Sequence, residues 1–378
     1  MSRKIAKGIG LALAMVIAGV SVADVTVFAA EPAEGTEDIV YTERVVADLD
    51  MDYSCEDTAY GVEVVTQDEK SVSELTEGDI LLLPAETDSE VMRAVEVTAI
   101  TDTRDGYRIE TKEPEDFADV VEYLDVSGKA GADISGIVTA DGVSVQTGIT
   151  SRAIGTSGTL NVAPLQFQID RSFGEYGSVH GNILMIPALE YRLLFDFGGI
   201  QELELRQCGQ LEIRNLGISG EVADVIPVAT IPYTFADGMF TAYVTLQIVY
   251  TASGEAYLDY VMDGTVDVLY NGSEFSFLCD YNPQELSYGI GGYGDVGANL
   301  GMGLVAYGTY TLMDVEVNAG IRAEGQMNSQ EGQADFGVAY FYMDGSFGQN
   351  SVLSQYGVYG SKVFFGKDNS PLKYEVIF

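Results

Sequence analysis

Hydrophobic and polar positions alternate most regularly between Val225 and Tyr281. From Thr241 to Tyr250 every second residue, beginning with Ala242, is apolar or aromatic. A period of two is typical of a β-strand, whose successive side chains point to opposite faces. Residue pairs that tolerate positive φ, and can therefore close tight hairpins, recur along the stretch: Asp237-Gly238, Ser253-Gly254, Asp263-Gly264 and Asn271-Gly272. The pattern predicts an antiparallel meander of about five strands.

The alternation continues over most of the second half of the chain. The runs 162–170 and 189–197 are apolar and aromatic, and the stretch 203–213 alternates Leu and Ile with charged residues, as in strands with one wet face. In 298–306 the polar face is occupied by Asn299, Gly301 and Gly303. Such a smooth face either packs closely on another backbone or curves. We expect residues 160–378 to form a large antiparallel β-sandwich or curved sheet.

The N-terminal part predicts a smaller unit of mixed structure. Two strands, 94–101 and 107–111, are joined by a turn at Arg104-Asp105-Gly106. A helix is expected from Pro114, because Phe117, Val120, Val121 and Leu124 recur at helical spacing. Residues 44–146 are thus predicted to be a small α+β module with one helix. The acidic segment 31–43 is predicted to be a disordered leader, and the Gly, Ser and Thr-rich segment 147–159 a linker.

The first thirty residues predict export. Basic residues at positions 3, 4 and 7 precede an apolar run and small residues, as in a secretory signal peptide that is cleaved after Ala30 or Ala23. No other stretch approaches the roughly 20 apolar residues of a spanning helix. We expect a secreted, extracellular protein that associates with the cell surface and has no transmembrane helix after signal removal.

A resemblance follows from the order of these segments. The segments that carry the resemblance are the N-terminal module, Pro164 to Asp170, Ile226 to Pro232, and a glycine-rich alternating tail. Through them the chain resembles the uncharacterised β-rich exported proteins of anaerobic Gram-positive bacteria. The resemblance covers most of the mature chain. It implies a β-rich exported protein and assigns no activity to any residue.

Charge narrows the range of partners. The formal net charge is -39, and no Lys or Arg lies between Arg214 and Arg322. Such a surface repels phosphate, so nucleic acid is not expected to bind. The expected partner is an extracellular protein or a glycan. Cys55, Cys208 and Cys279 are odd in number, which allows at most one disulfide, and Cys208 and Cys279 are the candidates for it.

The one cation that the sequence suggests is calcium. Asp48, Asp50 and Asp52 place carboxylates at alternate positions, like the start of a calcium loop, but Tyr53 and Ala59 occupy the places where an EF-hand has Gly and Glu. A solvated strand face accounts for the same pattern, with Leu49 and Met51 buried between the acids. No other cofactor is predicted.

Two further motifs do not predict a cofactor site or a catalytic site. The strings Gly289 to Gly294 and Gly292 to Gly297 match GxGxxG, but a strand pattern follows them instead of the helix that a dinucleotide site requires. His180 is the one histidine, so a histidine-rich zinc site is excluded, and no GxSxG motif accompanies it. We expect His180 in a turn or at the surface.

Two alternatives remain open. An extracellular glycoside hydrolase needs only two carboxylates, and Tyr could replace the missing Trp in stacking on sugars; candidates are Tyr233, Tyr243, Tyr250, Tyr257 and Tyr260. An outer-membrane β-barrel would explain the alternating C-terminus with Leu372, Tyr374, Val376 and Phe378. The favoured hypothesis assigns no catalytic residue: a non-enzymatic exported surface or extracellular protein, structural or adhesive.

Overall fold

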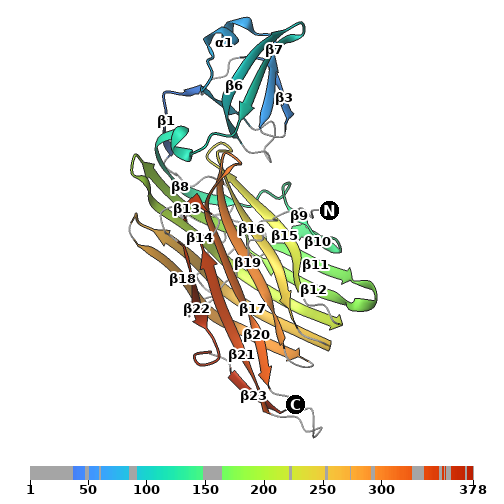
Figure 1. Ribbon diagram of the computed structural model, residues 1–378. Coiled ribbons are helices and arrows are strands. Elements are labelled where there is room, and N and C mark those ends of the chain that lie inside the picture. Colours follow the sequence, from blue (N-terminus) through green and yellow to red (C-terminus); the bar gives the residue numbers. More distant parts are fainter. Residues whose placement is uncertain are drawn as a thin grey trace.

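The computed structural model describes residues 37–46, 51–58, 61–84, 92–147, 164–220, 224–251, 254–272, 274–290, 294–325, 336–348, 351–352, 354, 359–370 and 373–377. Three sheets contain almost all of the regular structure, and pairing is antiparallel except between β2 and β5. A nine-stranded sheet (sheet 1) and an eight-stranded sheet (sheet 2) face one another as a β-sandwich, and a six-stranded sheet (sheet 3) lies at one end (Figure 1). The predicted antiparallel β-sandwich is confirmed.

Sheet 3 has the strand order β2-β5-β6-β7-β4-β3 and its own core around Val64, Leu81, Val95 and Ile109. The Asp68 side chain begins helix α1 by accepting hydrogen bonds from the backbone N–H groups of Lys70 and Ser71. The elements are β2 (Val45–Val46), β3 (Tyr53–Asp57), β4 (Val62–Thr66), α1 (Glu69–Glu74), β5 (Ile80–Leu83), β6 (Arg93–Thr103) and β7 (Gly106–Lys112). Strands β6 and β7 confirm the predicted hairpin, with Gly106 at φ 118°.

The predicted helix after Pro114 is wrong. Residues Phe117–Asp119 form a single 3₁₀ turn, η1, which Asp116 and Asp119 close as a capping box. Strand β8 (Val121–Gly131) follows at once and pairs with β1 and β13. The helical spacing of the apolar residues arose because a buried turn leads directly into a strand in which Leu124 and Val126 alternate. Pairing on both sides of β8 outweighs the weak local preference for helix.

The boundaries of the small unit also differ from the prediction. Strand β1 (Glu37–Tyr41) lies within the segment predicted to be a disordered leader, and pairs with β8 in sheet 1. Strands β8, β9 (Val138–Thr139) and β10 (Val143–Thr147) belong to the two large sheets, although the sequence placed them in the small module. The predicted signal peptide and most of the predicted linker lie outside the described residues.

Sheet 1 is organised by the 22-residue strand β14 (Gly199–Gly220). One half of β14 pairs with β13 and the other half with β12, while β17 pairs along its opposite side. Leu203, Leu205, Leu211 and Ile213 are fully buried, as their alternation predicts. The remaining strands are β11 (Leu165–Ser172), β12 (Gly177–Met185), β13 (Ala188–Asp196), β17 (Gly254–Tyr270) and β18 (Phe275–Ile290), and the turn η2 (Gly174–Tyr176) joins β11 to β12.

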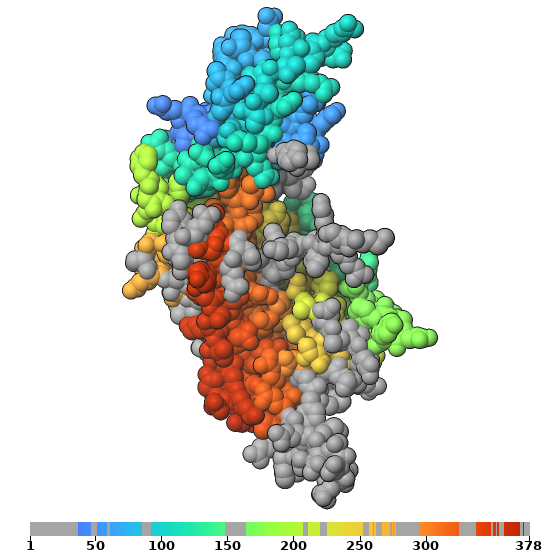
Figure 2. All heavy atoms as spheres, viewed as in Figure 1, coloured from blue at the N-terminus to red at the C-terminus, as the bar shows by residue number. Residues whose placement is uncertain are grey.

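Sheet 2 forms the face toward the viewer in Figure 2, where its later strands are coloured yellow to red. Its order is β22-β21-β20-β19-β16-β15-β9, and β23 also pairs with β21. The strands are β15 (Asp224–Phe235), β16 (Phe240–Tyr250), β19 (Gly294–Ala306), β20 (Tyr310–Gly325), β21 (Phe336–Phe347), β22 (Gly360–Phe365) and β23 (Lys373–Ile377). No helix within the described ranges is long and apolar enough to cross a membrane.

The predicted five-stranded meander is only partly correct. Asp237-Gly238 turns β15 into β16, and Asn271-Gly272 turns β17 into β18. Asp263-Gly264, however, lies within β17, where Gly264 pairs with Gly209 and Tyr281 on its two sides. The chain also passes from sheet 2 to sheet 1 between β16 and β17. The segment therefore contributes two hairpins to two different sheets.

A wedge of aromatic rings joins the small sheet to the sandwich. Phe117 is buried against Phe195 of sheet 1 and against Tyr307 and Tyr310 beside sheet 2. The Tyr310 hydroxyl donates a buried hydrogen bond to the Pro114 carbonyl oxygen at 3.0 Å. Phe117 also belongs to the same buried cluster as Ile80, Leu82 and Ala94 of sheet 3, so side chains from all three sheets share this core.

Candidate functional site

Strand β19 gives the outer face of sheet 2 a strip of three glycines with Asn299 among them. Its even-numbered residues, such as Ala298, Leu300 and Met302, are buried in the sandwich core. Gly297, Gly301 and Gly303 therefore lie on the opposite face, because neighbours in a strand point to opposite sides. The strip is bordered by β16 on one side and β20 on the other.

The strand register places polar residues along both borders of this strip. Thr245 of β16 pairs with Gly301, and Gly301 pairs with Glu316 of β20. In the next row, Gln247 pairs with Asn299 and Asn299 with Asn318. Hydroxyl and amide groups thus line the β16 side, and a carboxylate and an amide line the β20 side.

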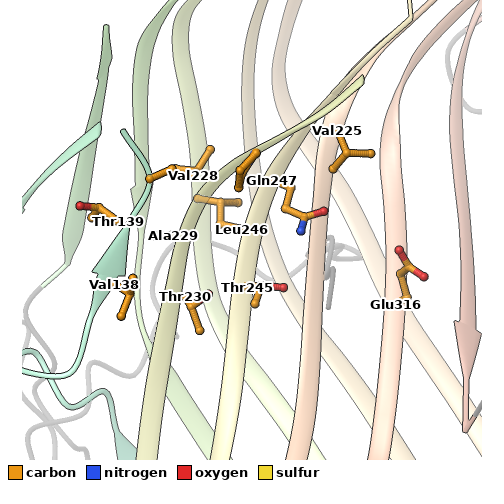
Figure 3. Close-up of a pocket in the computed structure, with 12 residues that line it drawn as sticks. Val138, Thr139, Val225, Val228, Ala229, Thr230, Thr245, Leu246, Gln247 and Glu316 are labelled. Atoms are coloured by element: carbon orange, nitrogen blue, oxygen red, sulfur yellow. The ribbon is translucent and has the colours of Figure 1, made fainter. Parts of the chain in front are cut away.

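A groove of about 600 Å³ extends from β9, β15 and β16 to Glu316 of β20, and we call it the β19 groove because β19 lies between β16 and β20. Figure 3 shows the polar ends of Thr245 and Gln247 turned toward the side on which Glu316 stands. The lining residues come from β9, β15, β16 and β20 and the segments beside them: Val138, Thr139, Ala140, Val225, Pro227, Val228, Ala229, Thr230, Thr245, Leu246, Gln247 and Glu316.

Hydrogen bonds hold the β20 side of the groove in place. The Asn299 Nδ2 group donates to Asn318 Oδ1 and, at 3.3 Å, to Glu316 Oε1. Asn318 Nδ2 in turn donates to Asp344 Oδ1 of β21 at 3.0 Å. These contacts make a polar ladder across three strands, so the Glu316 carboxylate is positioned before any ligand arrives.

Two buried polar atoms at the groove have no partner among the described residues. Thr245, which lines the groove, is 7% exposed and its hydroxyl oxygen is buried, and Asn299 Oδ1 belongs to a residue that is 3% exposed. Burying a polar atom without a hydrogen bond costs free energy, so such atoms are rare in folded proteins. Both atoms are closed off from solvent, so a ligand would instead meet the partly buried side chains of Gln247 and Glu316.

The charge of the groove is negative. Among the lining residues that the structure describes, Glu316 is the one with a charge. The nearest basic residue on the same face of β20 is Arg322, which binds both oxygens of Asp295 at 2.7 and 2.9 Å and stacks on the Tyr342 ring at 4.5 Å. Its hydrogen bonds with Asp295 raise the pKa of Arg322 above its usual value. Arg322 is therefore already neutralised and offers little attraction to an anionic ligand.

Acids on the outer face of sheet 1 have a different role. Lys129 pairs with Glu190 at 2.6 Å, Arg192 with Glu202 at 2.7 Å, and Arg206 with Asp267 at 2.7 Å. Desolvation raises the pKa of the nearby Glu204 carboxyl. These ion pairs cross from strand to strand, as expected for a solvated face that fixes register.

The predicted calcium ligands are not brought together in the described structure. Asp48 and Asp50 lie outside the described residues, and Asp52 is exposed, with its backbone carbonyl oxygen accepting from Thr66 Oγ1 at 2.7 Å. Within the described residues, no three His, Cys, Asp or Glu side chains are grouped so that they could hold a metal ion. The calcium hypothesis stays a prediction.

The other singled-out residues lie away from the groove or outside the description. His180 is exposed, as expected, but it lies within β12 against Gly217 and not in a turn. The GxGxxG segment leads into strand β19 at Gly294, which confirms the expected strand. The side chains of Cys208 in β14 and Cys279 in β18 are not described, so their bridge stays a prediction.

Sequence reasoning recognised the glycine face of 298–306 but missed the site beside it. The signal was present in Asn299, Glu316 and Asn318, which occupy polar positions of alternating strands. Their convergence depends on register, which the sequence does not display. Comparison with models of protein families, with curated proteins and with solved structures finds no match to this chain.

Proposed function

We propose that this is a non-enzymatic, exported surface or extracellular protein that adheres to a glycan through the β19 groove. The observation that carries the proposal is the polar lining of the groove, with Thr245 and Gln247 on the β16 side and Glu316 on the β20 side. Sugar hydroxyls both donate and accept hydrogen bonds. They would therefore pair with the mixture of hydroxyl, amide and carboxylate groups on the two sides.

The distribution of acids supports binding over hydrolysis. Glycoside hydrolases place two carboxyl groups on either side of the scissile bond, roughly 5 to 9.5 Å apart. In the β19 groove, Glu316 stands on the β20 side, and the lining residues on the β16 side include no acid. The facing side chains are Thr230, Thr245 and Gln247, which position a sugar but do not protonate a leaving group.

The location of the protein belongs to the same proposal. A basic start, an apolar run and small residues before Glu31 support export. The net charge of -39 supports a soluble, hydrated exterior that avoids nucleic acid. Outside the cell, polysaccharides are an abundant class of hydroxyl-rich polymer.

A pair of variants tests the groove. Gln247→Leu removes the amide of a partly buried lining residue, and Thr241→Val removes a buried hydroxyl on the same strand and face from a residue that does not line the groove. Binding to a panel of immobilised and soluble polysaccharides is measured for the wild-type protein and both variants. For a bound glycan, Gln247→Leu should weaken affinity about tenfold, the effect of one lost hydrogen bond in a partly buried site, while Thr241→Val should not.

Three results would contradict the proposal. One is the absence of binding to every polysaccharide of the panel, and another is equal weakening by both variants. The third is release of new reducing ends during incubation, which would support the hydrolase alternative instead.

A further inference from the structure

We infer that the β19 groove is specific for glycans with free amino groups, such as glucosamine polymers, and that Glu316 binds their ammonium group. This inference rests on the proposed function and deepens it by naming the sugar class. It depends on three features of the groove: one carboxylate, the lack of a cation among the described lining residues, and the distance between the two sides.

Glu316 is the feature that selects charge. The Glu316 carboxylate is partly buried, and one of its oxygens is held by the Asn299 amide, so it is ordered without being neutralised by that neutral donor. No Lys or Arg is among the described residues that line the groove. A hydrogen bond between an ammonium group and a carboxylate is about twice as strong as one between neutral groups, and partial burial limits its screening by salt.

The register places Glu316 opposite a neutral partner. Thr245 and Glu316 both pair with Gly301, so they lie two strand spacings apart, roughly 10 Å. A sugar ring that spans the groove would present one edge to the side formed by Thr245 and Gln247, and a substituent on its other edge to the Glu316 carboxylate.

The surrounding charge favours the same ligand class. No Lys or Arg occurs between Arg214 and Arg322, a range that includes β15 to β19 and most of β20. Uronic acids and sulfated sugars would be repelled, whereas an amino sugar polymer would be attracted. Neutral glycans would bind through the hydroxyl contacts alone.

The test compares three tetrasaccharides that share β-1,4 linkages and differ only in the substituent at C2 of each sugar ring. Binding of the glucosamine, N-acetylglucosamine and glucose tetramers is measured by titration calorimetry at low and high salt. The wild-type protein should bind the glucosamine tetramer about tenfold more tightly than the other two at low salt. Glu316→Gln keeps the size of the side chain and one acceptor oxygen but removes the charge. The variant should therefore bind all three tetramers with the same affinity. Glu122→Gln is the matched control, because it changes a partly buried strand acid on sheet 1.

The outcomes separate this inference from the proposed function. If the three tetramers bind equally, or if the preference survives in Glu316→Gln, the inference is wrong while glycan binding stands. If none of the three binds, the inference is also overturned, and the polysaccharide panel then decides the wider proposal.

Discussion

Gly297 of β19 lies directly opposite Gly320 of β20, and the two backbones are so close that neither position has room for a side chain. A Cβ on Gly297 would collide with the Ala319 carbonyl oxygen, and a Cβ on Gly320 with that of Val296. The same two strands pair Gly301 with Glu316, so the close approach at Gly297 and Gly320 helps to fix the register that places Glu316.

Gly320→Ala should therefore destabilise the protein. The added methyl group meets rigid backbone atoms, and forced overpacking of this kind costs about 2 kcal/mol of unfolding free energy. The comparison is Gly366→Ala, where a Cβ meets its nearest atoms at 3.6 and 3.9 Å. Denaturant unfolding of both variants measures the difference. Equal stabilities would show that β19 and β20 separate without strain.

Replacing Thr by Val should change the unfolding free energy in opposite directions at two buried threonines. The Thr241 hydroxyl is buried without a partner among the described residues, whereas the Thr111 hydroxyl both donates to and accepts from the Val62 backbone. Thr241→Val should raise the unfolding free energy by about 1 kcal/mol, because it removes an unsatisfied polar atom. Thr111→Val should lower it by about 2 kcal/mol, because it leaves two Val62 groups unpaired. Thermal unfolding followed by circular dichroism distinguishes these signs, and a loss of stability in Thr241→Val would mean that its hydroxyl has a partner.

The sequence predicted the sandwich because burial follows the period of two. Leu203 and Leu205 are fully buried, while Glu202 and Glu204 lie on the solvent-facing side of β14, as the alternation of apolar and charged residues requires. Turn chemistry was less reliable. Asp237-Gly238 and Asp263-Gly264 have the same composition, yet only the first turns, since pairing with β14 and β18 on both sides holds the second extended.

The site could be predicted only in part for a related reason. The glycine face of 298–306 is visible in the sequence, and so is the carboxylate of Glu316. Nothing local indicates that Gly301 pairs with Thr245 on one side and Glu316 on the other, because register between distant strands is set by the whole sheet. Polar convergence at a sheet face is therefore a property of the fold and not of a motif.

Phe117 should be a major contributor to the junction between the small sheet and the sandwich. Its ring is 2% exposed and packs edge-on against Phe195, with centroids 5.0 Å apart. Phe117→Ala should cost about 3 to 5 kcal/mol of unfolding free energy, the usual effect of removing a fully buried aromatic ring. Phe197, which is 88% exposed, provides the matched control, and Phe197→Ala should change stability by less than about 0.5 kcal/mol. Urea titration measures both. A small effect at Phe117 would indicate that sheet 3 is held to the sandwich by other contacts.

Alkaline pH should destabilise the sandwich through its buried tyrosines. Tyr191 of sheet 1 stacks on Phe235 of sheet 2 with ring centroids 3.9 Å apart, and its burial raises the pKa of the Tyr191 hydroxyl to about 12. In the unfolded chain the pKa is about 10, so between pH 10 and 12 the unfolded form loses its proton while the folded form keeps it. The stabilisation is complete below about pH 10 and is lost as pH rises through 12.

The Tyr191→Phe variant isolates this contribution. It keeps the ring against Phe235 and removes the ionisable hydroxyl, so its unfolding free energy should fall less than that of wild type between about pH 9 and about pH 11. Tyr257→Phe, at a residue that is 50% exposed, should follow the wild-type curve. Burial also raises the pKa of Tyr307, Tyr310 and Tyr342, so a residual decline should remain in Tyr191→Phe. Parallel curves for wild type and Tyr191→Phe would mean that the Tyr191 hydroxyl reaches water in the folded protein, and that sheets 1 and 2 pack less closely there than the ring contact with Phe235 requires.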